Sequence, residues 1–221
     1  MSSPTALVTG GSRGIGRAIV TYLTSAGWTV LAPERSELDL SRLDSVHEFA
    51  AGLPALDGLV LNAGVNNPTL LSEASAEEWA HTFAVNTESS LVLLRTVGAA
   101  MADRGSGRIV AISSAYASRA RRSRGMYGAS KAALEALVRT AAVELSPSGV
   151  MVNAIAPGFV DTELTRQNND QAAIDALLER VPVGRLAATE EVARAVEFLL
   201  SLDNAYITGQ VLAVDGGWAC T

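Results

Sequence analysis

Apolar residues fall into two patterns that alternate from one end of this sequence to the other. Short continuous apolar runs are typical of strands buried on both faces, whereas apolar residues that return every three or four positions are typical of helices with one buried side. The runs predict strands at Ala6–Val8, Thr29–Ala32, Leu59–Leu61, Arg108–Ile112, Met151–Ile155 and Val211–Val214.

Helical spacing lies between these runs. It predicts helices near residues 17–23, 43–50, 76–85, 89–101, 127–145 and 190–200, and a polar segment with some helix from 162 to 180. Strands and helices that alternate in this way indicate an α/β fold with a doubly wound parallel sheet.

The segment after the second predicted strand is short. Leu40 follows Arg35 by only five positions, and apolar residues from Leu43 onward already have helical spacing, with Ser41 as the predicted N-cap. A parallel strand is reached through a crossover of about a dozen residues or more. We therefore expect the helix between the second and third strands of such a sheet to be missing, with Asp39-Leu40 as a loop or vestigial strand.

Composition narrows the class of protein. No Pro/Gly/Ser-rich linker or charge block divides the 221 residues, so we predict one domain over residues 1–221. A net charge of −6 argues against a nucleic-acid partner. The only cysteine, Cys220, lies near the end, so we expect neither a disulfide framework nor a cysteine nucleophile, and no metal site is predicted. The start, Met1–Pro4, lacks a signal-peptide pattern and no apolar run could span a bilayer, which predicts a cytoplasmic protein without a membrane partner.

A glycine-rich turn joins the first predicted strand to the first predicted helix. Its sequence is Thr9-Gly10-Gly11-Ser12-Arg13-Gly14-Ile15-Gly16. Glycines let the backbone turn tightly and approach a pyrophosphate, whose charge is met by the amides and dipole of the helix N-terminus. Strand, glycine turn and helix together predict a dinucleotide site rather than a simple turn.

The end of the second strand carries charges of both signs. Glu34 is placed to accept the ribose hydroxyls of NAD, whereas Arg35 and Arg13 are placed to bind the 2′-phosphate of NADP. The alternative for each of these three residues is a position in a solvated loop without a role in cofactor binding. Because two cations converge, the sequence favours NADP over NAD.

Tyr127 and Lys131 lie one helical turn apart, and Lys131 is the only lysine in the chain. A nearby cation favours the phenolate over the phenol, so the pair is a way to build a general acid/base that works near neutral pH. The alternative is a coincidence on a surface helix.

Polar and small residues end the central strands. Asn62-Ala63-Gly64 follows one of them and Ser113-Ser114 follows the next, where a ligand would bind in an open α/β sheet. Asn86 lies between two predicted helices and is otherwise read as a cap or turn residue.

Arginines are dense in the loop between Ser114 and the Tyr127 helix. Arg121, Arg122 and Arg124 should border the same cleft as Tyr127. They form either a solvated loop or a dock for an anion, which would be the phosphopantetheine or acidic surface of a carrier protein, or a carboxylated substrate.

With these residues in place the chain resembles the short-chain dehydrogenases/reductases over almost its whole length, and the 3-oxoacyl-carrier-protein reductase branch in particular. The resemblance rests on motifs in the family's order and at about its spacings: Thr9-Gly10, Gly14-Ile15-Gly16, Asn62-Ala63-Gly64, Asn86, Ser114, Tyr127 with Lys131, Pro157-Gly158, Val183-Gly184-Arg185-Leu186, Ile207-Thr208-Gly209-Gln210 and Asp215-Gly216-Gly217.

This resemblance implies a single-domain Rossmann-type fold, a nicotinamide cofactor and commonly a tetramer. It implies that Tyr127 donates the proton, that Lys131 lowers the Tyr127 pKa and binds the nicotinamide ribose, that Ser114 hydrogen-bonds the carbonyl oxygen, and that Asn86 holds a water that links Lys131 to solvent. Residues expected to contact the cofactor are Gly10, Ser12, Arg13, Gly14, Ile15, Gly16, Glu34, Arg35, Asp39, Leu40, Asn62, Ala63, Gly64, Tyr127, Lys131, Pro157, Gly158, Val160 and Thr162.

The function that the resemblance implies is NAD(P)H-dependent reduction of a ketone, a 3-oxoacyl thioester or a related carbonyl, either as a small molecule or bound to a carrier protein. The alternatives are NAD-dependent oxidation of a secondary alcohol or dihydrodiol, and a non-catalytic dinucleotide-binding sensor. The chain departs from the family in the shortened segment, in Ala117 where a glycine is common, and in the arginine-rich loop. Apolar faces on residues 89–101 and 129–145 and the last strand predict a homo-oligomer, a tetramer or dimer.

Overall fold

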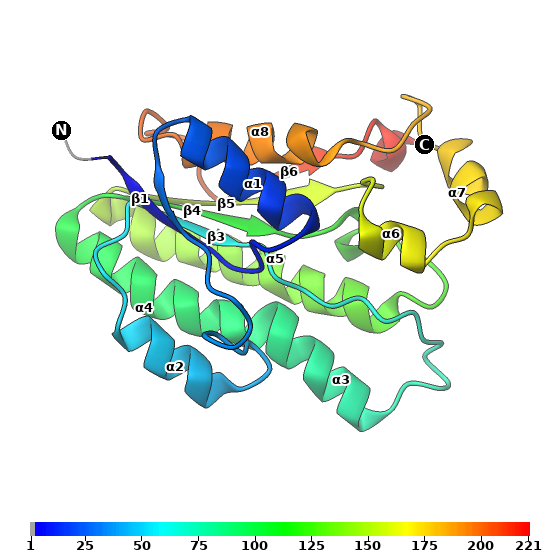
Figure 1. The fold of residues 1–221 in the computed structure, drawn as a ribbon, viewed down its shortest axis with the longest axis horizontal. Coiled ribbons are helices and arrows are strands. Elements are labelled where there is room, and N and C mark those ends of the chain that lie inside the picture. Colours follow the sequence, from blue (N-terminus) through cyan, green and yellow to red (C-terminus); the bar gives the residue numbers. More distant parts are fainter. Residues whose placement is uncertain (1–2) are drawn as a thin grey trace.

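The chain folds around a parallel sheet, which a computed structural model describes together with its helices over residues 3–221 (Figure 1). The strands are β1 (Thr5–Val8), β2 (Thr29–Leu31), β3 (Gly58–Leu61), β4 (Gly107–Ile112), β5 (Val150–Pro157) and β6 (Val211–Val214). They lie in the order β2-β1-β3-β4-β5-β6, and every neighbouring pair is parallel. The predicted α/β fold with a parallel sheet is confirmed.

The strand order reverses at β1. Val30 of β2 pairs with Ala6 on one side of β1, and Leu59 of β3 pairs with Leu7 on the other side. At such a reversal the connections leave two neighbouring strands toward opposite faces of the sheet, which opens a crevice at their carboxyl ends. The fold therefore places a ligand site beyond the ends of β1 and β3.

Helices cover both faces of the sheet. α1 (Gly14–Ser25) and α8 (Thr189–Leu200) pack on one face, and α2 (Leu43–Ala51), α4 (Ser89–Arg104) and α5 (Gly125–Leu145) pack on the other (Figure 1). Successive side chains of a strand point to opposite faces, so Ala6 and Val8 are buried in the first layer and Leu7 in the second. This two-sided burial explains the continuous apolar runs of the strands.

The segment between β2 and α2 contains neither a helix nor a strand. The expected loss of the helix before Asp39-Leu40 is confirmed, and Asp39-Leu40 lies in a loop that Leu38 anchors in the core. α2 then connects this loop to β3. The prediction of Ser41 as the N-cap of α2 is wrong, because Arg42 occupies that position. The Ser41 hydroxyl instead donates to Asp39 Oδ1 at 2.7 Å.

The junction between α3 (Ala76–Phe83) and α4 is a π-helical turn, Ala84–Glu88. Its backbone runs on into α4 without a break, so Asn86 lies inside a continuous helical path and not in a loop. A π-helical turn widens the helix locally and is frequent at functional sites. This widening is the local reason that Asn86 turns inward, where it is completely buried.

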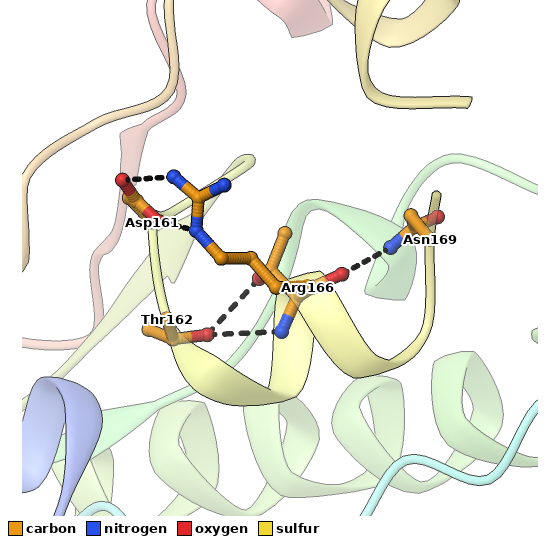
Figure 2. A network of polar contacts seen from close by, with 5 residues as sticks. Asp161, Thr162, Arg166 and Asn169 are labelled. Carbon is orange, nitrogen blue, oxygen red and sulfur yellow. Dashed lines mark hydrogen bonds and ion pairs between the residues drawn. The ribbon is translucent and has the colours of Figure 1, made fainter. Parts of the chain in front are cut away.

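The polar segment after β5 forms two short helices, α6 (Glu163–Gln167) and α7 (Gln171–Leu178). Thr162 caps α6 by accepting a hydrogen bond from the Thr165 amide at 3.2 Å, and Arg166 pairs with Asp161 at 2.8 Å (Figure 2). Asn169 donates from Nδ2 to the Thr165 carbonyl at 2.8 Å (Figure 2). These contacts stabilise α6 and the residues that flank it. None of the helices within residues 3–221 is long and apolar enough to cross a bilayer.

Candidate active site

A cleft of about 400 Å³ lies at the carboxyl ends of the central strands, at the reversal in strand order. It brings together most of the residues that the sequence predicted for a cofactor site. All of those nineteen residues line it except Glu34. Of the predicted catalytic residues, Ser114, Tyr127 and Lys131 line the cleft, whereas Asn86 lies behind its wall.

The glycine turn forms one end of the cleft. Gly10 has a φ of +65°, and a Cβ on Gly16 would lie 2.0 Å from the Gly10 carbonyl oxygen, so neither position tolerates a side chain. Asn62 holds the turn closed by donating from Nδ2 to the Thr9 carbonyl at 2.9 Å and to the Gly10 carbonyl at 3.1 Å. Asn62 thus fixes the shape of the glycine turn.

The first turn of α1 fits a pyrophosphate. Arg13, its N-cap, makes no side-chain hydrogen bond to the helix amides, and the first turn contains no acidic side chain. These amides and the helix dipole are therefore free to meet an anion. This is the arrangement that a dinucleotide requires at a glycine turn.

Cationic side chains define the end of the cleft where the adenosine ribose of a dinucleotide would lie. Arg13 and Arg35 both line it. Glu34 does not, and its amide is held by Glu37 Oε2 at 2.8 Å in the exposed turn. The prediction that Glu34 contacts the cofactor therefore has no support in the geometry. Asp39 accepts hydrogen bonds from Ser41, which is the main cause of its lowered pKa.

Tyr127 and Lys131 lie on the same side of α5, as the helical spacing predicts. The Lys131 ammonium lies 5.9 Å from the centroid of the Tyr127 ring and donates to the Ile112 carbonyl, at the end of β4, at 2.8 Å. Ser114 follows β4, and its hydroxyl accepts from the Tyr116 amide at 3.2 Å. The neighbouring Ser113 hydroxyl donates to Glu135 Oε1 at 2.7 Å, so Ser114 is the serine available to a ligand.

Burial governs the acidity of both groups. It raises the pKa of Tyr127, and a hydrogen bond with Ser114 and the charge of Arg124 offset this rise only in part. The net direction is therefore set by burial, and the lowering of the Tyr127 pKa that the resemblance implies for Lys131 stays a prediction. Burial also lowers the pKa of Lys131 to about 8, so its ammonium is still mostly protonated at neutral pH.

Asn86 clamps the end of β3 to α5. Its Oδ1 accepts from the Val65 amide at 2.8 Å, and its Nδ2 donates to the Val65 carbonyl at 3.0 Å and to Ser130 Oγ at 2.9 Å. Both amide hydrogens are therefore engaged within the protein. The water-holding role implied for Asn86 stays a prediction, and its observed contacts are those of a brace.

Aromatic side chains that the sequence did not single out form a wall beside Tyr127. The Tyr116 ring lies 6.4 Å from the Tyr127 ring and 5.9 Å from the Trp218 ring, edge to face, and Phe159 packs 5.3 Å from Trp218. Tyr116 and Phe159 line the cleft. The position of Tyr116, two residues after Ser114, was the signal that could have identified it.

The arginine-rich loop divides into residues inside and outside the cleft. Arg121 and Arg124 line it, whereas Arg122 is exposed outside it. Arg119 is turned away and donates to the Ala219 and Thr221 carbonyls. Of the three arginines considered for an anion dock, only Arg121 and Arg124 therefore lie where they could bind an anion in this cleft.

Comparison with protein-family models gives two matches that together span nearly the whole chain. The model described as "Enoyl-(Acyl carrier protein) reductase" matches residues 37–219, and the model described as "short chain dehydrogenase" matches residues 4–46.

Curated relatives and solved structures agree with these matches. The chain is 35% identical over 236 residues to acetoacetyl-CoA reductase of Rhizobium meliloti strain 1021, covering 97% of this chain and 98% of that protein. It is 37% identical over 235 residues to the 3-oxoacyl-[acyl-carrier-protein] reductase FabG of Escherichia coli K12, covering 96% of each. A structure from Beutenbergia cavernae, described as a "putative NAD(P) dependent gluconate 5-dehydrogenase" with bound NADP, superposes with a TM-score of 0.94 at 37% identity, covering 100% of this chain and 98% of that one.

The buried ammonium predicts a specific pH dependence of stability. Because the Lys131 pKa falls from 10.5 to about 8 on folding, the unfolded chain holds this proton more tightly between those values. The free energy of unfolding should therefore rise with pH through this window, by up to about 3 kcal/mol. We expect Lys131→Met to lack this rise in urea unfolding at about pH 7.5 and about pH 10. If the free energy of unfolding rose with pH by the same amount in the wild type and in Lys131→Met, this pH dependence could not be assigned to Lys131.

Gly64 separates Asn86 from Lys131, and a Cβ there would lie 3.2 Å from both Asn86 Oδ1 and Lys131 Nζ. We expect Gly64→Ala to shift the ammonium and to lower kcat by about tenfold or more, because small misplacements in an active site are costly. The matched control is Gly52→Ala, where no atom lies closer than 3.8 Å. Equal kcat in both variants would show that the ammonium tolerates displacement.

Proposed function

The chain belongs to the short-chain dehydrogenase/reductase family and is an NAD(P)-dependent oxidoreductase, and from this premise we propose that it reduces a ketone to a secondary alcohol with Tyr127 as the proton donor. One observation carries the proposal. Ser114, Tyr127 and Lys131 line the same cleft as the glycine turn and the uncapped N-terminus of α1.

The residues of this cleft fit a nicotinamide dinucleotide. The amides of the first turn of α1 would bind the pyrophosphate, Lys131 would bind the nicotinamide ribose, and Pro157, Gly158, Val160 and Thr162 would surround the carboxamide. When bound, the reduced nicotinamide supplies the hydride that the ketone carbon accepts. The protein supplies the position, the proton and the polar contacts.

Tyr127 is suited to give the proton. Since burial raises its pKa, the phenol is protonated at neutral pH and is ready to donate to an oxygen that becomes an alkoxide. The Ser114 hydroxyl lies beside it and would donate a hydrogen bond to the same oxygen as charge develops. The Lys131 ammonium would stabilise the phenolate that remains after the transfer.

Lys131 would also complete the return of a proton to Tyr127. A pKa of about 8 lets this ammonium give up and regain a proton near neutral pH more readily than an ordinary lysine. Its fixed contact with the Ile112 carbonyl leaves further ammonium hydrogens for the ribose and for solvent.

NADP is the cofactor that we propose the chain prefers. Arg13 and Arg35 line the cleft, and only an exposed, long ion pair of 3.8 Å links Arg35 to Asp39. The case for NAD rested on Glu34, which lies outside the cleft. Two arginines without a strong internal partner suit the 2′-phosphate of NADP.

The names of the relatives support a 3-oxoacyl thioester or a related ketone as substrate, since they include acetoacetyl-CoA and 3-oxoacyl-[acyl-carrier-protein] reductases. The description of the Beutenbergia cavernae structure supports the reverse direction, oxidation of a secondary alcohol. The same residues serve both directions, with Tyr127 accepting the proton in oxidation. A non-catalytic dinucleotide-binding sensor would not require Ser114, Tyr127 and Lys131 to line one cleft.

We also propose that copies of the chain associate. Support comes from apolar side chains that are exposed on the surfaces predicted for association: Leu91 on α4, Val143 on α5 and Leu212 on β6. Val143 is 76% exposed, which is unusual for valine on a helix that packs in the core.

Removal of the phenolic hydroxyl tests the proton donor. We expect Tyr127→Phe to lower kcat for reduction of acetoacetyl-CoA by about 10² to 10⁴-fold, followed as loss of reduced-nicotinamide absorbance, while NADPH binds within about threefold of wild type. Tyr22→Phe on α1 is the matched control. A Tyr127→Phe enzyme with more than about a tenth of wild-type turnover would reject Tyr127 as the donor.

Removal of one cation tests the cofactor preference. We expect Arg35→Ala to raise KM for NADPH by about 10- to 100-fold, because a charge-assisted contact to a phosphate is lost, and to change KM for NADH little. Arg17→Ala is the control, since Arg17 is exposed on α1 and does not line the cleft. Equal changes for both cofactors would argue against a 2′-phosphate contact.

A further inference from the structure

Arg124 is a buried cation in the catalytic cleft. It is the N-cap residue of α5, only 6% of its surface is exposed, and it lines the cleft. Its guanidinium donates from Nη1 to Asn66 Oδ1 at 3.0 Å, and Asn66 is a neutral partner. A guanidinium has five N–H donors, so this single bond leaves most of them without a partner among residues 3–221.

No carboxylate neutralises this charge. The ion pairs within residues 3–221 join Arg35 to Asp39, Arg139 to Glu135, Arg166 to Asp161 and Arg185 to Glu191. A buried charge is normally paired, because desolvation of an unpaired charge is strongly unfavourable. Arg124 is therefore held at an energetic cost that its contact with Asn66 alone does not offset.

The free donors of Arg124 remain accessible. In the described part of the chain, the fully enclosed side-chain atoms without a hydrogen bond are Arg108 Nε and Trp218 Nε1. The Nε and Nη2 atoms of Arg124 are not among them, so neither atom is sealed inside the protein without a hydrogen bond. They present two parallel N–H directions of the kind that bind a carboxylate.

Arg124 lies close to the reacting group. It precedes Tyr127 by three residues at the start of α5, and its charge acts on the Tyr127 phenol. Arg121 reaches the same region, where it donates to the Tyr116 hydroxyl and lies 5.8 Å from the Tyr116 ring centroid. Arg121 and Arg124 thus lie close to Tyr116 and Tyr127 and line the same cleft.

Resting on the proposed function, we propose that the preferred substrate carries a carboxylate near its ketone and that Arg124, assisted by Arg121, binds this carboxylate. Arg124 is then a specificity-determining residue, and the substrate class is a small oxo acid. Its carboxylate supplies the charge that the protein itself does not place beside Arg124.

Other anions fit this position less well. The phosphates of the dinucleotide belong at α1 and at Arg13 and Arg35, which are different walls of the cleft. The acidic surface of a carrier protein would meet exposed side chains such as Arg122, whereas Arg124 is too deeply buried for a protein surface to reach. A 3-oxoacyl thioester carries no charge next to its ketone.

Paired substrates that differ only in charge test the proposal. We would measure kcat/KM with NADPH for pyruvate and levulinate and for their neutral amides, pyruvamide and levulinamide. In at least one pair the wild-type enzyme should prefer the acid by about tenfold or more, because a charge-assisted bidentate contact is lost with the amide. This comparison requires no variant and decides the proposal even if an Arg124 variant does not fold.

Variants assign the preference to Arg124. We expect Arg124→Gln to lower the ratio of kcat/KM for acid over amide by about 10- to 100-fold, and Arg124→Lys to restore part of it. Arg122→Gln is the matched control and should leave the ratio unchanged, since its side chain lies outside the cleft. A ratio that Arg124→Gln leaves unchanged would overturn the role of Arg124.

The two proposals fail in different ways. A wild-type enzyme that reduces acids and amides equally, or acetoacetyl-CoA far better than any oxo acid, would overturn the oxo-acid proposal and leave ketone reduction standing. A wild-type enzyme that reduces none of these compounds with NADPH or NADH would overturn the proposed function itself.

Discussion

The burial of one ammonium group without a carboxylate partner is the constraint that shapes this molecule. Lys131 is buried, and in the part of the chain that the structure describes its one hydrogen-bond acceptor is the Ile112 carbonyl at the end of β4. Gly64 at the end of β3 gives it room, and Asn86 fixes the residue after that glycine. Four elements therefore surround this one charge: the ends of β3 and β4, α5 and the π-helical turn. Burying the charge is unfavourable for folding, and its interaction with a ligand explains why it is present.

The same logic extends across the cleft. Arg13, Arg35, Arg121, Arg124 and Lys131 line it, and Asp39 and Glu163 are the acidic side chains among its lining residues. The protein as a whole has a net charge of −6, so positive charge is concentrated where anionic ligands would enter. Cofactor and substrate are thus accommodated by charges that the protein leaves largely unneutralised.

Much of this was predictable from the sequence, because the relevant signals are local. Continuous apolar runs predicted strands buried on both faces, and the glycine turn and the Tyr127–Lys131 spacing predicted two walls of one cleft. The failures come from tertiary contacts. Ser41 bonds to Asp39 and not to α2, and the burial that raises the pKa of Tyr127 could not be measured from the sequence. Nothing local in the sequence distinguishes Arg122 from Arg124, which is buried and contacts Asn66, far away along the chain.

The aromatic wall has a consequence for how the molecule assembles. Trp218 packs against Tyr116 and Phe159, and Arg119 holds the carbonyls of residues that follow Trp218. The glycine turn, by contrast, is closed by contacts within the first 62 residues. During synthesis the parts of the glycine turn are available early, whereas the aromatic wall waits for Trp218, because contacts between distant segments form late. A nascent chain would thus complete its pyrophosphate-binding turn before the wall beside Tyr127.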